Sequence, residues 1–260
     1  MFSAPFSISR YDHVDSETGE YNHRGALDAF SQAPNNAVFL LQTCGYNDDG
    51  MDRSNEQWDD VFEIAKDKNA VIVLDSAYMG LVRGYESERY PIEQSVKAGL
   101  LTLVCTSKSK NMGLYNERLG ALFIANAASN FGVEQVPRLD QLAARIVRRT
   151  YSNPPLVAAK AAAIALRQES YFEELEQARN RLTANRQVFG EIVKDELPAV
   201  SRGGGLFTKV SSQGFSPAQQ QVLAEAGVFA LPNSRSNLGG IRYDQVERVG
   251  LAVLQALKTT

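Results

Sequence analysis

Three short apolar runs in the first half of the chain constrain its fold more than any other feature. They are AVFLLQTC, AVIVLD and LLTLVC, at residues 37–44, 70–75 and 100–105. After the first run, Ser54 and Gln57 have the spacing of a capping box, and Trp58 and Phe62 begin an apolar stripe at helical spacing. A second amphipathic stretch with Pro91 separates the other two runs. Strands joined by helical crossovers run parallel, so we expect a βαβαβ unit.

The second half of the chain is richer in helical pattern. We expect a further strand at 120–126, helices at 139–150, about 156–195, 216–227 and 244–258, and short strands at 203–210 and 228–232. This order predicts an α/β protein with a mostly parallel sheet flanked by helices. A larger domain over residues 1–163 would be joined through the long helix to a small C-terminal α/β domain over residues 164–260.

Charge and composition exclude several classes of protein. The 260 residues carry a net charge of −3, so no strong field favours nucleic acid or an anionic membrane. The first residues lack the pattern of a signal peptide, and no run reaches the roughly 18 apolar residues of a membrane span. We expect a cytoplasmic protein with Cys44 and Cys105 reduced. His13 and His23 lie in a polar stretch, so no metal site is expected.

Polar side chains follow each of the three strand-like runs. Asn47 follows the first, Asp75 and Tyr78 end or follow the second, and a loop with Ser107 and Lys110 follows the third. Ligands of parallel α/β sheets bind outside the carboxyl ends of the strands, so these side chains would share one site. A lysine there could attack a carbonyl if burial or nearby cations lower its pKa, and an aspartate could face a cationic ring nitrogen.

Each of these residues also has an ordinary structural interpretation. Asp75 could cap the turn that follows it, and Asn47 could be a turn residue. Tyr78 could be a half-buried core residue, while Lys108 and Lys110 could be solvated surface charges. The residue pattern alone leaves both interpretations open.

The loop SKSKNMGLYNERLG at 107–120 is the most specific motif of the chain. With it, the chain resembles the pyridoxal-phosphate-dependent aspartate and aromatic aminotransferases, class I of fold type I, from about residue 8 to the C-terminus. The resemblance implies pyridoxal 5′-phosphate as cofactor and Lys110 as the lysine that forms the Schiff base with it. It also implies that Arg118, Ser107 and Ser109 bind the cofactor phosphate.

Other segments match the same family in the same order. VLDSAYMG implies that Asp75 pairs with the pyridine nitrogen and that Tyr78 contacts the ring hydroxyl, and YNDDG gives Asn47 the second contact to that hydroxyl. NSRSNLGG implies that Arg235 binds the substrate α-carboxylate. VRRTYSNPP implies that Arg148, or Arg149 if the alignment shifts, reaches across a dimer interface to a side-chain carboxylate, as for aspartate or glutamate.

The chain also departs from the family. Family members are longer at the N-terminus, and the extra part holds a phosphate-binding turn and the aromatic ring that stacks on the cofactor. A large domain shortened in this way would expose apolar surface, which leads us to expect a homodimer. Asp48 and Asp49 replace a Pro-Thr pair, which would disfavour anionic ligands if both side chains point into the site.

The resemblance implies an aminotransferase-like enzyme that moves an amino group between an amino acid and a 2-keto acid through Lys110. Two alternatives stay open at this point. One is a lyase, isomerase or cyclase that uses the same pocket without the cofactor. The other is a non-catalytic assembly subunit.

Overall fold

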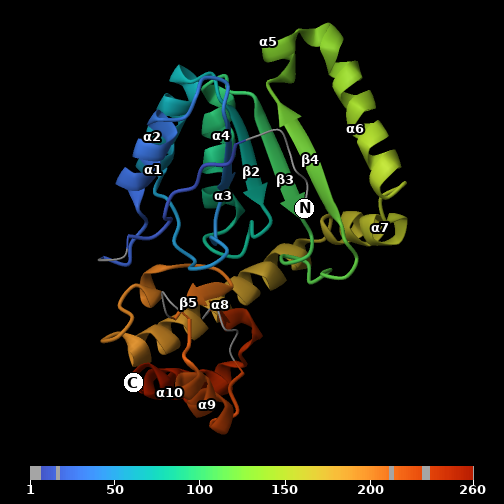
Figure 1. The fold of residues 1–260 in the computed structure, drawn as a ribbon. Helices are drawn as coiled ribbons and strands as arrows, with labels where there is room; N and C mark the ends of the chain where they lie inside the picture. Colours follow the sequence, from blue (N-terminus) through green and yellow to red (C-terminus); the bar gives the residue numbers. More distant parts are fainter. Residues whose placement is uncertain (1–6, 16–17, 211–213, 230–234, 260) are drawn as a thin grey trace.

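Four strands form the sheet of the larger lobe (Figure 1). The structure, a computed structural model, describes residues 7–15, 18–210, 214–229 and 235–259. The strands are β1 (Val38–Gln42), β2 (Val71–Ser76), β3 (Thr102–Ser107) and β4 (Gly120–Ala125), in the spatial order β1-β2-β3-β4. β1, β2 and β3 are parallel, as the sequence predicts, whereas β4 is antiparallel to β3. No helical crossover separates β3 from β4, so the chain returns along its neighbour.

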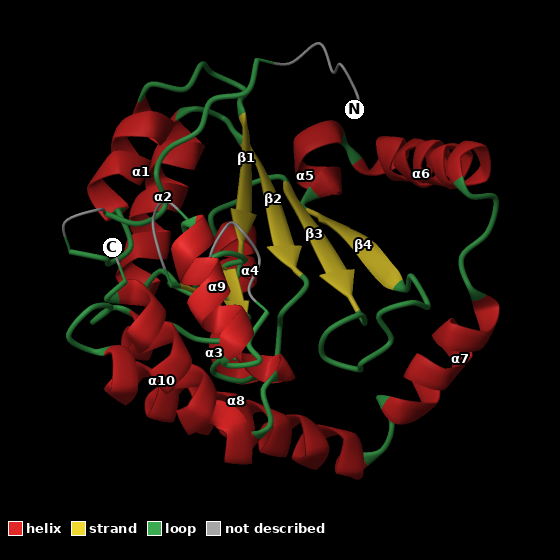
Figure 2. Ribbon diagram, turned by 60° about the horizontal axis from the view of Figure 1, so that its bottom comes forward, coloured by secondary structure: helices red, strands yellow, loops and turns green. Residues whose placement is uncertain are grey.

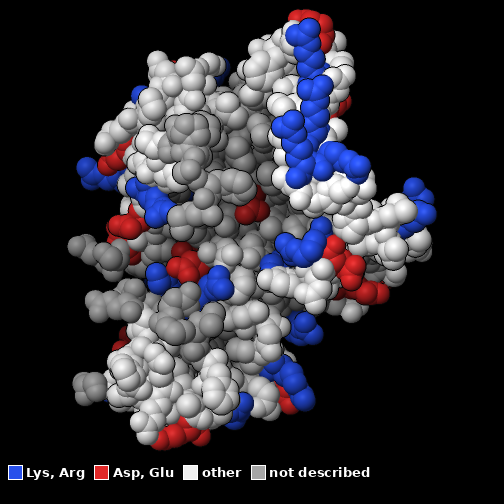
Figure 3. Space-filling view, turned by 45° about the vertical axis from the view of Figure 1, so that its right-hand side comes forward, with Lys and Arg blue, Asp and Glu red and all other residues white. Residues whose placement is uncertain are grey.

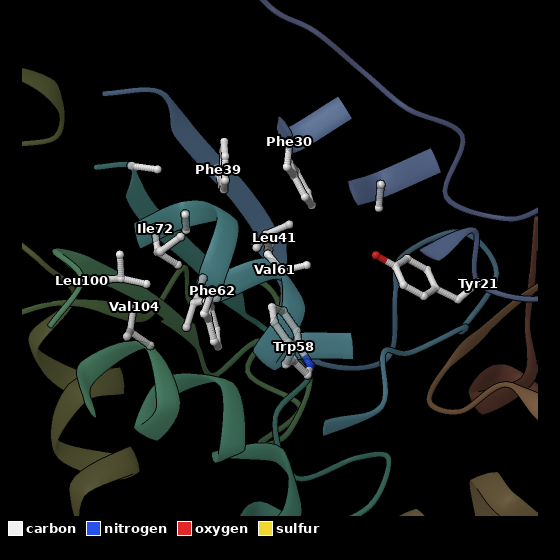
Figure 4. Packing of buried hydrophobic residues seen from close by; sticks show 14 residues of the cluster. Tyr21, Phe30, Phe39, Leu41, Trp58, Val61, Phe62, Ile72, Leu100 and Val104 are labelled. Carbon is white, nitrogen blue, oxygen red and sulfur yellow. The ribbon is translucent and has the colours of Figure 1, made fainter. Parts of the chain in front are cut away.

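Helices cover one face of this sheet. They are α1 (His23–Ser31), α2 (Asn55–Asp67), α3 (Tyr85–Glu88) and α4 (Tyr90–Lys97). The expected capping box is present, since the Ser54 hydroxyl accepts from the Gln57 amide and the Gln57 side chain accepts from the Ser54 amide. The large core side chains between helices and sheet include Phe30, Phe39, Leu41, Trp58, Val61, Phe62, Ile72 and Val104 (Figure 4). This core fixes the strands whose carboxyl ends carry the polar residues.

The opposite face of the sheet has less cover. Leu40 is 71% exposed and Val38 is 55% exposed, while Phe39 and Leu41 between and beside them are buried. Because successive side chains of a strand point to opposite faces, the exposed residues mark one face as open. Exposed apolar surface agrees with the expectation from the sequence.

A helical arm leads from the sheet to the smaller lobe. It contains α5 (Ala127–Phe131), the 3₁₀ turn η1 (Val133–Gln135), α6 (Val136–Thr150) and α7 (Leu156–Ala165), and it runs beyond the β4 edge before joining α8 (Glu169–Val193) (Figure 2). The helical zone expected at about 156–195 is present, but it is divided. The zone is two helices, because Gln168 has extended backbone angles that a helix cannot continue.

The smaller lobe packs α8 against the C-terminal elements. These are η2 (Val200–Arg202), β5 (Phe207–Lys209), α9 (Pro217–Glu225), β6 (Arg235–Asn237), η3 (Leu238–Gly240), η4 (Tyr243–Gln245) and α10 (Val246–Leu257). Its core contains Phe189, Val193, Leu223, Leu238 and Val253. Val228 and Phe229 are not in a strand, and the rest of the strand expected at 228–232 lies outside the described residues. The domain boundary at residue 163 stays a prediction.

Candidate active site

The carboxyl edge of the sheet positions Asp75. In the parallel register Gln42 lies opposite Asp75, and Asp75 lies opposite Cys105. The Asp75 side chain is half-buried, and its Oδ1 accepts a hydrogen bond of 3.0 Å from the Ala77 amide. Oδ1 of Asp75 therefore does cap the turn, which was the alternative interpretation of this residue. No residue in the described part of the chain hydrogen-bonds to Oδ2, so that oxygen remains available to a ligand.

The turn after β2 places Tyr78 in the site. Tyr78 is 4% exposed, and its pKa is raised by burial and by the Asp75 carboxylate, while Arg235 opposes the rise. The next turn is fixed by Glu88, whose fully buried carboxylate accepts from the backbone amides of Gly80, Val82, Arg83 and Gly84. Glu88 is a positioning residue that sequence reasoning missed, since a glutamate in a helical segment gives no sign of such a role.

The smaller lobe brings Arg235 to the same place. Asn47 Oδ1 accepts a hydrogen bond of 2.9 Å from Arg235, and the Arg235 guanidinium lies 4.7 Å from the centre of the Phe207 ring. The Phe207 ring in turn meets Tyr78 edge-on at 6.0 Å. Three predicted residues, Asn47, Tyr78 and Arg235, are therefore brought together. Phe207 was not predicted, because only tertiary packing places it between them.

The loop after β3 carries Lys110 beside this group. Lys110 Nζ lies 4.0 Å from the centre of the Tyr115 ring, and the pKa of Tyr78 responds to Tyr115. Asn111, which is buried, donates from Nδ2 to the Met79 carbonyl at 3.0 Å and to the Tyr85 hydroxyl at 3.2 Å. These bonds tie the lysine loop to the turn that follows β2. Neither Tyr115 nor Asn111 was predicted, although both lie inside the motif.

Lys108 occupies a different environment from Lys110. It is half-buried, and burial lowers the pKa of its amine. In the same loop, Ser107 Oγ accepts from the Ser109 amide at 3.1 Å, and Ser109 is buried. Arg118 is exposed and donates from one guanidinium nitrogen to the Tyr115 carbonyl at 2.8 Å, which leaves its other donors for an anion.

The two acidic residues after Asn47 point in different directions. Asp48 Oδ2 lies 3.3 Å from Lys209 Nζ, on β5. The Asp49 side chain is 10% exposed and accepts from the Met51 amide at 2.7 Å, and desolvation raises its pKa to about 7. Asp48 is therefore paired and Asp49 is readily protonated, which reduces the acidic charge expected at the site.

Arg148 does not join this group within one chain. It lies on α6, is exposed, and donates to Ser152 Oγ at 2.6 Å. Figure 3 shows basic side chains gathered along α6, a helix that carries Arg138, Arg145, Arg148 and Arg149. The role of Arg148 in substrate binding stays a prediction that requires a second copy of the chain.

The residues present fit a pyridoxal phosphate molecule. Asp75 offers a carboxylate oxygen that has no hydrogen-bond partner among the described residues, and Tyr78 and Asn47 offer polar groups beside it. Lys110 offers an amine on the adjacent loop. Ser109 and Arg118 offer donors for a phosphate. By contrast, the described residues contain no cluster of three or more His, Cys, Asp or Glu side chains suited to a metal ion. Likewise, no helix among them is long and apolar enough to cross a membrane.

Together the fold and this site define a two-lobed α/β protein with a lysine-bearing loop at the carboxyl ends of parallel strands. The family model "Aminotransferase class I and II" matches residues 3–251. The chain therefore belongs to the class I and II aminotransferase family, which confirms the resemblance found in the sequence.

Individual relatives of the chain are also aminotransferases. The chain is 34% identical to the aromatic-amino-acid aminotransferase of Escherichia coli (strain K12), over 96% of this chain and 64% of that protein. It is 30% identical to the cytoplasmic aspartate aminotransferase of Schizosaccharomyces pombe, over 97% and 63%. The aromatic-amino-acid aminotransferase of Burkholderia pseudomallei, solved covalently bound to pyridoxal phosphate, has a TM-score of 0.85 at 27% identity, over 97% of this chain and 64% of that one. The chain thus spans slightly less than two thirds of the length of these relatives.

Proposed function

We propose that this chain carries the aminotransferase chemistry of its family, with pyridoxal phosphate as cofactor. It would move an amino group between an amino acid and a 2-keto acid. The observation that carries the proposal is the convergence of Asp75, Tyr78, Asn47 and Arg235 beside the loop of Lys110. The family model and a relative bound to pyridoxal phosphate support it.

Each side chain has a distinct role in this proposal. Pyridoxal phosphate supplies a cationic ring that withdraws electrons from the substrate α-carbon. Asp75 would hold the proton on the ring nitrogen, and Tyr78 and Asn47 would orient the ring hydroxyl. Ser107, Ser109 and Arg118 would bind the phosphate. Their donors suit a dianion, and a guanidinium binds phosphate through two parallel hydrogen bonds.

Lys110 would work twice in the reaction. Its amine would hold the cofactor covalently at the aldehyde carbon, with the aldehyde oxygen leaving as water, until the substrate amine displaces it. The freed Lys110 amine would then be the general base that takes the proton from the substrate α-carbon and the general acid that gives it back. The Tyr115 ring, 4.0 Å from Lys110 Nζ, holds the amine in place while it is charged, since an aromatic face attracts a cation.

Arg235 would bind the α-carboxylate of the substrate. Asn47 holds one guanidinium nitrogen and the Phe207 ring lies beneath the plane, so the guanidinium is already oriented. If Arg148 from a second copy binds another carboxylate, the substrate is a dicarboxylic amino acid such as aspartate or glutamate. A solved relative from Psychrobacter sp. B6 was cocrystallised with aspartic acid.

A homodimer is part of this proposal. Leu142 and Ile146 are more than half exposed on α6, the helix that bears Arg148, and Val157 on α7 is 81% exposed. Apolar side chains gathered on one arm are typical of a protein interface. Two relatives are named cytoplasmic aspartate aminotransferases, and we propose the cytoplasm for this chain as well.

Transamination between L-aspartate and 2-oxoglutarate, with added pyridoxal phosphate, tests the function. We expect turnover that Arg235→Gln reduces mainly through a higher KM, because a carboxylate contact is lost. Glu86→Gln is the matched control, since Glu86 lies on the exposed surface of α3. Absence of turnover with both aspartate and aromatic amino acids would contradict the proposal.

A further inference from the structure

A second basic residue lies next to Arg235 on the small two-stranded sheet. In the antiparallel pairing of β5 and β6, Lys209 is directly opposite Arg235. Directly opposite residues project from the same face of a sheet, and Phe207 shares that face two residues earlier. Because the Phe207 ring meets Tyr78, this face looks toward the larger lobe.

Two consecutive residues of the larger lobe contact these two cations. Asn47 accepts from Arg235 at 2.9 Å, and Asp48 lies 3.3 Å from Lys209. Asn47 is neutral, so this hydrogen bond does not itself neutralise Arg235. Asp48, however, brings a carboxylate to Lys209, the residue opposite Arg235, and an unpaired carboxylate there would repel the substrate carboxylate.

We propose that Lys209 is a positioning residue whose ammonium neutralises Asp48, so that Arg235 keeps its attraction for the substrate carboxylate. The inference rests on the proposed function of Arg235. Lys209 would not touch the substrate itself. Its effect would be electrostatic and would depend on Asp48 being present.

The exposure of the pair supports an electrostatic role over a role in folding. The Lys209 and Asp48 side chains are 39% and 37% exposed. Ion pairs this open to water contribute little to stability. Two further charged groups lie nearby: Asp49, whose side chain is 10% exposed, and Arg186, whose guanidinium is bound by the carbonyls of Gly204 and Phe207. Both remain unchanged in the variants below.

The test compares Lys209→Met, Asp48→Asn and the double variant with the wild type. The probe is 3-phenylpropanoate, a carboxylate without an amine, and its dissociation constant is measured by calorimetry with pyridoxal phosphate present. We expect Lys209→Met to weaken binding about three- to fivefold, because Asp48 is left unpaired. Asp48→Asn alone should bind as well as the wild type or more tightly, and the double variant should regain the wild-type constant.

Other results would overturn the inference. If Lys209→Met binds like the wild type, Lys209 has no such role. If Asp48→Asn weakens binding as much as Lys209→Met, and the double variant is no better, the pair acts as a mechanical link between the lobes.

Arg235→Gln separates a failure of this inference from a failure of the proposed function. It should abolish probe binding if Arg235 receives the carboxylate. A wild-type protein that does not bind the probe, or an Arg235→Gln variant that binds it normally, overturns both the role of Arg235 and the inference built on it. Unfolding curves of all variants should superimpose on the wild-type curve, because the pair is exposed.

Discussion

The Asp49 carboxylate lies where a charge is costly. Its side chain is only 10% exposed, and burial raises its pKa from 3.8 to about 7. His13 Nε2 is 3.8 Å away, but burial lowers the pKa of His13 to about 3. The imidazole is therefore neutral above that pH, and the contact is not an ion pair there. The fold therefore keeps the Asp49 carboxyl group protonated at mildly acidic pH.

Replacing Asp49 with asparagine should change how stability depends on pH. The folded state holds the Asp49 proton up to about pH 7, whereas the unfolded chain releases it near pH 3.8. Wild-type stability should therefore fall as pH rises between these values, relative to Asp49→Asn, by up to about 1.4 kcal/mol per pH unit. Urea unfolding from pH 4 to 8 measures this difference.

The comparison isolates Asp49 because its neighbours are the same in both proteins. Asp52, whose pKa burial raises to about 6, adds a trend of the same sign, and His13 adds the opposite one. Both contributions largely cancel between variant and wild type. Asp48→Asn is the control for the loss of a neighbouring, half-exposed carboxylate. A stability difference that stays constant from pH 4 to 8 would contradict the account.

Individual residues show what a motif can reveal. Asn47, Asp75, Tyr78 and Lys110 could be singled out because each ends or follows a strand in a recognisable segment, and their roles stay predictions. Phe207 and Glu88 could not, since their roles come from contacts between segments far apart in the chain or from backbone amides that no pattern marks. The direction of the Asp49 side chain also depends on packing, so the sequence left its charge at the site undecided.

Among the elements, the turn after β1 connects the two lobes. The Gly50 carbonyl accepts a hydrogen bond of 2.7 Å from the Gly204 amide, and Gly50 has a φ of +82°. A Cβ on Gly50 would lie 2.5 Å from the Gly204 carbonyl oxygen and 2.8 Å from that of Phe207. The Phe207 oxygen belongs to β5 and the Gly204 oxygen to the segment that leads into it, so the turn and the small lobe constrain each other.

Gly50→Ala should therefore be strongly destabilising. We expect a loss of about 3 kcal/mol or more, from the left-handed backbone together with the clash. Gly99→Ala is the matched control, because Gly99 has a φ of +76° but nothing lies within 4 Å of the added Cβ. It should cost only about 1 kcal/mol. Equal losses in urea unfolding would contradict the clash with the small lobe.

Element types were easier to predict from the sequence than their ends and directions. The apolar runs predict the three parallel strands. The capping residues and the apolar stripe predict α2. β4 is antiparallel because the loop between Lys108 and Leu119 folds back and pairs β4 with β3. The apolar run at 120–126 does not encode that pairing. The break at Gln168 is invisible to helix propensity, because Leu166, Arg167 and Glu169 on either side are good helix formers.

At the scale of the whole molecule, the exposed apolar arm is the feature that needs a partner. Leu142 and Ile146 are four residues apart on α6, so they lie on the same face of the helix, one turn from each other. If a second copy covers this face, Arg148 on the same helix lies near the interface. The homodimer and the binding of a dicarboxylic substrate are therefore linked proposals.

Leu142→Glu should convert the dimer to a monomer without unfolding it. A charge placed in an apolar interface loses its water, which opposes association, while the side chain is already exposed in the single chain. Sedimentation equilibrium at micromolar concentration measures the mass. Ala144→Glu, on the opposite face of the same helix, is the control and should remain dimeric. A wild-type protein with the mass of a monomer would contradict the proposal.

The proposed function requires a covalent bond between Lys110 and pyridoxal phosphate, and borohydride reduction detects that bond. The protein is incubated with pyridoxal phosphate, its absorption spectrum is recorded before and after borohydride reduction, and the modified peptide is identified by mass. We predict an absorption band that reduction removes and a label on Lys110. The band should be absent in Lys110→Ala and kept in Lys108→Ala, the matched control two residues away. A label on Lys108 instead, or no band at saturating cofactor, would contradict the account.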